Sequence, residues 1–355
     1  MSEALLASEK GAAAQVAAPS SGARQFWQRL RAQRAVTVAA VVFALLVLVA
    51  LTAPLLTALE GQDPNAFHPA LVDSAAGGVP KGSFGGISGD HWLGVEPQTG
   101  RDLFARLVYG ARVSLGVAFI ATLVQVFIGV ALGLLAALGG RWADQVVSRF
   151  TDVVVALPLL VISLGLIAIV PDSVPRPMLI TFVIAVVGWS GTSKIVRSSA
   201  LSLKSLDYVS AARLSGWGRL AVARRELLPA LAAPVITYGV LLVPANVSIE
   251  AALSFLGVGI KPPTPSWGQM LTEANTWYQS APTYLLLPAG FLFVTVLSLT
   301  VVGEGVRTAL DPRAASRLKV GVKSRKSRES RKSRESRESR EHLESRKSLE
   351  KEASK

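Results

Sequence analysis

The sequence of 355 residues contains no cysteine and only three histidines, His68, His91 and His342. The lack of cysteine excludes a disulfide framework, a thiolate metal site and a cysteine nucleophile, and the histidines lack metal-ligand spacing. The phosphate-binding pattern G-x-x-x-x-G-K-[ST] is also missing, since no glycine precedes the lysine of the similar stretch 188–194. No nucleophile with a histidine base and no carboxylate pair is evident. We therefore expect a chain that is not an enzyme and that binds no cofactor or metal itself.

Charge is scarce outside the C-terminal end. The chain is 50% hydrophobic, with a mean hydropathy of +0.43 and a net charge of +13. Of its 37 Lys/Arg, 17 follow position 305, together with 8 of the 24 Asp/Glu. Most of the basic excess thus belongs to the tail. The basic net charge is therefore only weak evidence for nucleic-acid binding. We expect no nucleic-acid partner.

Long apolar runs dominate the remainder. A bilayer core about 30 Å thick needs about 20 apolar residues in a helix. Six runs meet or approach this length, at residues 35–59, 113–140, 153–171, 177–193, 227–249 and 274–303. They predict an all-α integral membrane protein with six transmembrane helices.

The basic residues of the loops predict the orientation of these helices. With the N-terminus inside, the loops on the cytoplasmic side hold most of the Lys/Arg, as the positive-inside rule requires. We therefore predict that both termini are cytoplasmic. The first run follows basic residues and has no small-x-small cleavage site, so it is read as an anchor and not as a removed signal peptide.

The two ends differ from the apolar centre. We predict a cytoplasmic N-terminal extension at 1–33, a six-helix transmembrane domain at 34–312 and a disordered, charged tail at 313–355. The second half of the extension can form an amphipathic helix on the inner leaflet or serve only as a stop-and-anchor segment. The tail repeats Ser-Arg-Glu and Ser-Arg-Lys triplets, whose period fits neither helix nor strand. RNA binding by the tail is disfavoured because no aromatic residue is interleaved for stacking.

A polar segment with the sequence DYVSAARLSGWGRLAVARRELLP occupies residues 207–229, between the fourth and fifth runs. Residues 208–214 contain good helix formers and neither glycine nor proline. Asp207 is placed to cap this helix at its N-terminus, and Gly216 can supply a left-handed turn at its C-terminus. A short basic helix in a membrane-protein loop is typical of a docking surface for a soluble partner.

The details of this loop carry a family resemblance. Ala211 and Ala212 leave little side chain, which permits close approach to a partner groove, and Pro229 begins the next span, where a missing N–H costs little. The arrangement resembles the cytoplasmic coupling loop of ABC importer permeases, whose pattern is Glu-Ala-Ala, three residues, Gly, and then Leu-Pro. Ser210 stands where the family has Glu. The resemblance implies a coupling loop at 201–229 whose ATPase-docking residues are Asp207, Tyr208, Ser210, Ala211, Ala212, Arg213, Gly216, Leu228 and Pro229.

Two further stretches, at 91–115 and 250–270, look like the C-type permease of dipeptide, oligopeptide and nickel importers. The resemblance implies a bacterial cell-membrane protein with a type I ABC importer fold, which translocates peptides or a related small solute. It also implies a second homologous permease, two ABC ATPase subunits that bind ATP and Mg, and an extracellular solute-binding protein. Membrane lipid is a further expected partner.

Four residues are candidates for the pathway or an external gate. Gly100, Arg101 and Asp102 precede the second span, where they equally fit a turn and a helix cap, with Asp102 as the cap. Glu250 is the carboxylate of the fifth run, about 27 Å along it. We expect it near the outer edge of the hydrocarbon, where it reaches the headgroups or faces the pathway mouth or the second permease.

Two other classes of protein compete with this interpretation. A secondary, ion-coupled transporter would need ionisable residues within its spans, and these spans are nearly free of them. A membrane scaffold or receptor is the third class. Co-purification of ATPase subunits would separate all three.

Overall fold

The computed structural model describes residues 22–171 and 173–310. The predicted tail and the first part of the N-terminal extension therefore lie outside the described residues. The chain separates into two units, Leu30–Val306 and Met1–Arg29 with Arg307–Lys355. The candidate sites all lie in the unit Leu30–Val306.

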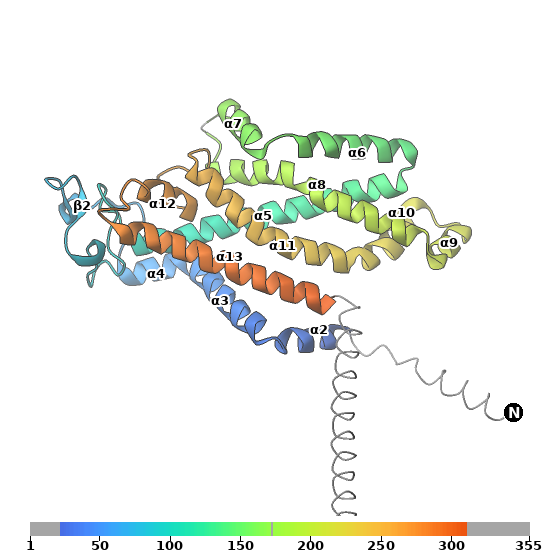
Figure 1. Cartoon of the computed structure of the whole chain (residues 1–355), viewed down its shortest axis with the longest axis horizontal. Coiled ribbons are helices and arrows are strands. Elements are labelled where there is room, and N and C mark those ends of the chain that lie inside the picture. Colours follow the sequence, from blue (N-terminus) through green and yellow to red (C-terminus); the bar gives the residue numbers. More distant parts are fainter. Residues whose placement is uncertain (1–21, 172, 311–355) are drawn as a thin grey trace, which may run out of the picture. The chain divides into compact units, whose positions relative to one another are not determined.

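The described part of the chain is mostly helical, with a long loop region before α5 (Figure 1). That region contains the short helices η1 and η2 and the two-residue strands β1 and β2, which pair antiparallel. The elements in chain order are α2 (Gly22–Arg31), α3 (Arg34–Leu51), α4 (Ala53–Glu60), η1 (Pro69–Leu71), β1 (Val72–Asp73), β2 (Val79–Pro80), η2 (Ser83–Gly85), α5 (Leu103–Leu138), α6 (Arg141–Ala156), α7 (Leu159–Ile169), α8 (Arg176–Lys204), α9 (Asp207–Leu214), α10 (Arg219–Val222), η3 (Ala223–Leu227), α11 (Leu228–Phe255), α12 (Trp267–Ala274) and α13 (Pro282–Leu310).

Five helical segments of the described residues are long and apolar enough to cross a bilayer, or six if one bent pair counts as a span. The five are Arg34–Leu51, Leu103–Leu138, Arg176–Lys204, Arg219–Phe255 and Pro282–Leu310. The predicted third span is wrong as a continuous helix, because α6 and α7 meet there at an angle of 90°. The break is at Leu157, which is extended because it precedes Pro158.

The fourth span is longer than predicted and continues from residue 193 to Lys204. Its cations have partners on neighbouring elements. The Arg197 guanidinium forms a bidentate ion pair with Asp144 of α6, and Lys204 Nζ donates to the Ala137 carbonyl at 3.1 Å. Because these cations have partners, α8 can continue as one helix from its apolar first part into its basic last part.

Helices α5 and α8 approach each other closely through two glycines on consecutive turns of α5. A Cβ added at Gly129 would lie 2.4 Å from Thr192 Cβ, and one at Gly133 would lie 2.7 Å from Val196 Cβ. Small residues four apart permit close backbone approach of membrane helices, where packing drives association. The pair therefore depends on the lack of a side chain at these two positions.

A buried polar cluster joins α5, α8 and α11. Asn246 Nδ2 donates to Gln125 Oε1 at 2.9 Å and to Thr122 Oγ1 at 2.8 Å, while Gln125 Nε2 donates to the Ile184 carbonyl at 2.9 Å. Both amides are fully buried. The cluster fixes the register of three helices in a region with no competing water.

Candidate functional site

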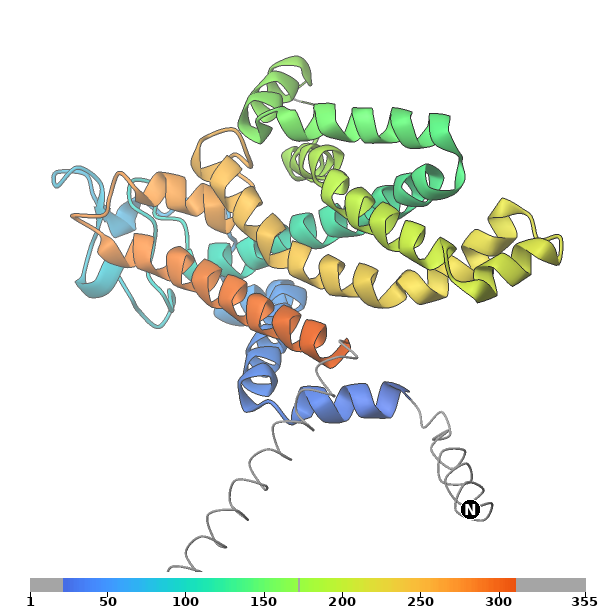
Figure 2. The same cartoon turned by 45° about the vertical axis from the view of Figure 1, so that its right-hand side comes forward.

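The candidate docking helix α9 is held to the rest of the unit by one side chain. Val209 is fully buried and packs in a cluster with Ala137 on α5 and Ala200 on α8, and with Leu227 at the end of η3 and Leu231 in the first turn of α11. In both Figure 1 and Figure 2, α9 lies at the end of these helices opposite to α12 and β2. Helix α9 is therefore a short, laterally supported element at one end of the unit.

The end of α9 is closed as the sequence predicts. Gly216 has a φ of +83°, in the left-handed region that glycine adopts without strain. Its N–H donates to the Arg213 carbonyl at 3.0 Å, and the Trp217 N–H donates to the Ala212 carbonyl at 3.1 Å. These two bonds form a Schellman motif, which stops the helix and turns the chain toward α10.

The start of α9 differs from the prediction. Leu206 is the N-cap residue, with extended backbone angles, and Asp207 is the first helical residue. The predicted capping role of Asp207 is therefore wrong, because its backbone is already helical. Its carboxylate lies in the first turn, where it interacts favourably with the positive end of the helix dipole.

Most of the α9 surface is free of contacts within this chain. Tyr208, Ser210, Ala211 and Arg213 are exposed, and Leu214 is 90% exposed. Ala212 is half-buried, because it lies one turn from Val209 on the same side of the helix. Of the two small residues, Ala211 is the one on the accessible face.

Pro229 lies in the first turn of α11, as predicted. Helix α10 and a π-turn precede α11 without a break, so the continuous helical segment runs from Arg219 to Phe255. The preceding residues 223–227 form a π-turn, and the Leu228 N–H bonds to the Ala223 carbonyl. A π-turn shifts the local hydrogen-bond pattern, which accommodates a proline ring without ending the helix. Leu228 lies at the join and is partly exposed.

At the opposite end, Asp102 caps α5 as predicted. Its Oδ1 accepts from the Ala105 N–H at 2.7 Å, and His91 Nδ1 lies 2.8 Å from its Oδ2. Glu60, at the end of α4, accepts from the Trp92 N–H at 2.9 Å. Burial raises the pKa of Glu60 from 4.5 to about 7, with the Trp92 hydrogen bond opposing the shift and the charge of Asp102 adding to it.

Arg101 belongs to a buried ion network, together with residues that the sequence did not single out. Its Nε donates to Glu96 Oε2 at 2.7 Å and its Nη2 to Glu273 Oε2 at 3.2 Å. Arg106 is fully buried and binds the other Glu96 oxygen, and it also donates to Gln269 Oε1 at 2.9 Å. Burial raises the pKa of Glu96, whereas the two guanidiniums oppose this shift. The network ties the loop before α5 to α12.

Gly100 is needed for the same loop. Its φ is +66°, and an added Cβ would lie 2.1 Å from the His68 carbonyl oxygen. Gly100, Arg101 and Asp102 therefore form a buried turn and cap. A role for them in an external gate stays a prediction.

The expected exposure of Glu250 is wrong, whereas its depth in the membrane stays a prediction. Its side chain is fully buried inside this subunit and neither reaches the headgroups nor faces an open mouth. Its Oε1 accepts from Ser254 Oγ at 2.9 Å, and this hydroxyl accepts from the Ile260 N–H at 3.1 Å. Helix α12 covers this part of α11, since a Cβ at Gly268 would lie 2.6 Å from Ala251 Cα. The packing of a later loop and helix, which local sequence does not reveal, buries the carboxylate.

Comparison with known families identifies the class of this chain. Residues 129–316 match the family described as the binding-protein-dependent transport system inner membrane component, and residues 21–71 match the N-terminal TM domain of oligopeptide transport permease C. The chain belongs to this family and is a membrane-spanning permease component of an ABC importer. It is therefore not an ion-coupled secondary transporter.

Similar proteins indicate which group of ABC importer permeases this chain belongs to. The chain is 32% identical over 293 residues to a dipeptide transport system permease protein of Alkalihalophilus pseudofirmus, covering 82% of this chain and 90% of the relative. It is also 32% identical over 293 residues to a glutathione transport system permease protein of Pectobacterium atrosepticum, covering 82% and 92%. A solved structure of the MetNI methionine ABC transporter, in an inward-facing conformation, aligns with 58% of this chain and 96% of that chain, at 18% identity and a TM-score of 0.46. The chain is thus a C-type permease of the peptide importer group.

Proposed function

We propose that this chain translocates short peptides, or peptide-like solutes such as glutathione, as one of two permease subunits. In this proposal two ATPase subunits supply the energy and an extracellular solute-binding protein delivers the substrate. The similarity to permeases named for dipeptides and for glutathione supports the substrate class. Uptake of a labelled dipeptide, in competition with glutathione and with longer peptides, tests it.

We further propose that α9 docks on an ATPase subunit. The observation that carries this proposal is the pairing of one buried anchor, Val209, with an exposed face that includes Ala211 and Leu214. An exposed leucine beside small residues suits a groove on a soluble protein, because the leucine supplies apolar area and the alanines allow close approach. The remaining predicted docking residues, Asp207 to Gly216 and Leu228–Pro229, surround this face or connect it to α11.

The proposed orientation puts the α9 end and both termini in the cytoplasm. The distribution of Lys/Arg among the loops supports this orientation. The network around Arg101 and Arg106 then lies on the outer side. Because the sequence lacks a phosphate-binding loop, we propose that ATP and Mg bind to the partner ATPases and not to this chain.

Mechanistically, closure of the ATPase pair on ATP would push the two docking helices and turn the permease pair outward. Shifting a two-state equilibrium from 1:99 to 99:1 requires about 5.5 kcal/mol. The contacts of α9 must carry energy of that order, and the buried Val209 cluster is suited to transmit it to α8 and α11.

The test is the variant Ala211→Arg, which places a long charged side chain on the accessible face of α9. We expect the full importer to lose its ATPase subunits on purification and to lose uptake, while the permease reaches the membrane at normal levels. Ala76→Arg, the same substitution on an exposed loop at the other end of the unit, is the matched control for co-purification. Normal ATPase binding by Ala211→Arg would exclude α9 as the docking helix.

A further inference from the structure

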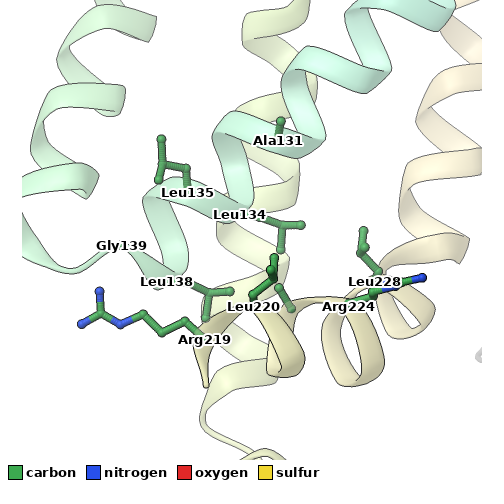
Figure 3. A pocket seen from close by; sticks show the side chains of 10 residues that line it. Ala131, Leu134, Leu135, Leu138, Gly139, Arg219, Leu220, Arg224 and Leu228 are labelled. Atoms are coloured by element: carbon green, nitrogen blue, oxygen red, sulfur yellow. The ribbon is translucent and has the colours of Figure 1, made fainter. Parts of the chain in front are cut away.

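An apolar groove lies between the C-terminal end of α5 and the segment that joins α9 to α11 (Figure 3). Its volume is about 610 Å³, within the range of small-molecule sites. Leucines from both walls point toward one another, with Leu134 and Leu138 on α5 facing Leu220 on α10. The groove is a preformed apolar surface that no side chain of residues 22–171 or 173–310 fills.

The groove runs along the charge-free part of α5, which the proposed orientation places in the inner half of the bilayer. Ala131, at one end of the groove, is eight residues from Gly139 at the end of α5, which is about 12 Å along the helix axis. Ala131 and Leu135 are exposed. An apolar groove along a membrane span suits an acyl chain of the surrounding lipid better than a soluble partner.

Cations surround the other end of the groove. Arg219 and Arg224 line it, and Figure 3 shows them on opposite flanks of the leucine cluster. A second, more polar hollow of about 370 Å³ shares Leu138 and Arg219 with the groove and adds Lys204 and Arg213. Within the described part of the chain, no carboxylate lines either hollow. Asp144 is close enough to interact with Lys204, but the lining itself contributes only positive charge, which attracts an anion.

We infer that the two hollows bind one anionic phospholipid of the inner leaflet, with an acyl chain along Ala131 and Leu135 and the headgroup beside Arg219 and Arg224. This inference rests on the proposed orientation, which puts the α9 end at the cytoplasmic surface. Basic pockets between helices on that side are suited to anionic headgroups. The charge complementarity and the depth together favour a lipid over a protein occupant.

The site also has a mechanical consequence. Arg219, Leu220 and Arg224 belong to α10 and the π-turn, which connect the docking helix to α11. A lipid bound here contacts α5 on one side and this connection on the other. Occupancy therefore holds the connection against α5, so the lipid composition of the membrane sets how firmly α9 is coupled to the spans.

The experiment titrates the purified permease pair with phosphatidylglycerol and, in parallel, with phosphatidylcholine, and counts bound lipids by native mass spectrometry. We expect tighter binding of phosphatidylglycerol. The double variant Arg219→Gln/Arg224→Gln should weaken it roughly 30-fold, which corresponds to about 1 kcal/mol for each arginine, and should leave phosphatidylcholine binding unchanged. The control Arg34→Gln/Arg149→Gln removes the same charge from exposed residues outside both hollows and should have no effect.

A third variant, Ala131→Trp, fills the inner end of the groove without changing charge and should also weaken phosphatidylglycerol binding. Equal effects of the two double variants would overturn the site, and so would normal binding by Ala131→Trp. Loss of the bound lipid when ATPase subunits are added would overturn it too, by assigning the groove to the ATPase. Ala211→Arg should keep the lipid while losing the ATPase, so failure of the lipid site and failure of the docking proposal are distinguishable.

Discussion

The buried pair Asn246 and Gln125 permits a quantitative test of how the helices of this permease are held together. We expect Asn246→Leu to lower the free energy of unfolding by about 2–4 kcal/mol. The substitution removes the reciprocal bonds with Gln125, at 2.9 and 3.3 Å, and the bond to Thr122 at 2.8 Å. Interhelical hydrogen bonds in membranes average about 0.6 kcal/mol each, which gives about 2 kcal/mol for the three. Leaving the Gln125 carbonyl oxygen buried without its donor adds about 1–2 kcal/mol.

The assay is a double-mutant cycle, measured as thermal unfolding of the purified protein in detergent. An unfolding entropy of about 2.1 cal/mol/K per residue gives roughly 1.3 °C per kcal/mol for 355 residues, so Asn246→Leu should lower the melting temperature by about 3–5 °C. Gln125→Leu should have a similar effect. The double variant should be more stable than the sum predicts by about 1–2 kcal/mol, because removing the second amide also removes the unpaired group.

The control cycle combines Asn246→Leu with Thr272→Val, whose hydroxyl bonds to the Ser254 and Gly268 carbonyls and not to the amide cluster. These two effects should add. Additivity within about 0.5 kcal/mol in the Asn246 and Gln125 cycle would refute the reasoning, because it would mean that the two amides do not stabilise each other.

Three further outcomes follow from the geometry. Gly129→Val should reduce the amount of folded permease, because its Cβ would clash with Thr192, whereas Gly116→Ala should not, since nothing lies within 4 Å of that position; equal yields in a membrane-expression assay would contradict this. The raised pKa of Glu60 means that the folded protein binds the Glu60 proton more tightly than the unfolded chain does. The protonated carboxyl therefore stabilises the fold fully below about pH 4.5, and this stabilisation is lost as pH rises through about 7. Glu60→Gln should therefore gain stability relative to the parent between about pH 5 and 8, and parallel melting curves would show that the shift is absent. Glu96→Gln should destabilise the fold by about 3 kcal/mol, because it leaves Arg106 and Arg101 buried with a weaker partner; a melting temperature within a degree of the parent would oppose this.

Much of the architecture follows from local features of the sequence. Charge-free runs predict the spans because lipid tolerates neither exposed backbone nor unpaired charge. The cap by Asp102 and the left-handed turn at Gly216 are also local, since each involves residues within a few positions. The bend at Pro158 was readable from the rule for the residue before proline, but the apolar character of 153–171 hid it.

The polar contacts between distant segments could not be predicted in the same way. Arg101 and Glu273 are 172 residues apart in the chain, and a single sequence gives no sign that they meet. The contact between Gln125 and Asn246 could have been predicted in part, because a polar side chain within an apolar span needs a hydrogen-bond partner. The half-buried position of Ala212 depends on how Val209 packs against α5 and α8, which no property of the loop itself determines.

The rigidity of α5 and α8 bears on how a push on α9 reaches the outer end of the unit. Helix α8 leads through Ser205 and Leu206 directly into α9, so displacement of α9 acts on α8 first. The glycine contacts at Gly129 and Gly133 and the amide cluster leave little room for α8 to slide along α5, and packed helices of this kind move as one body. Helix α5 begins at Leu103, and its Arg106 belongs to the ion network that also holds α12. In the proposed docking arrangement, a movement of α9 therefore reaches the loop before α5 through this helix pair, and changes that loosen the pair should reduce coupling even when α9 still binds its partner.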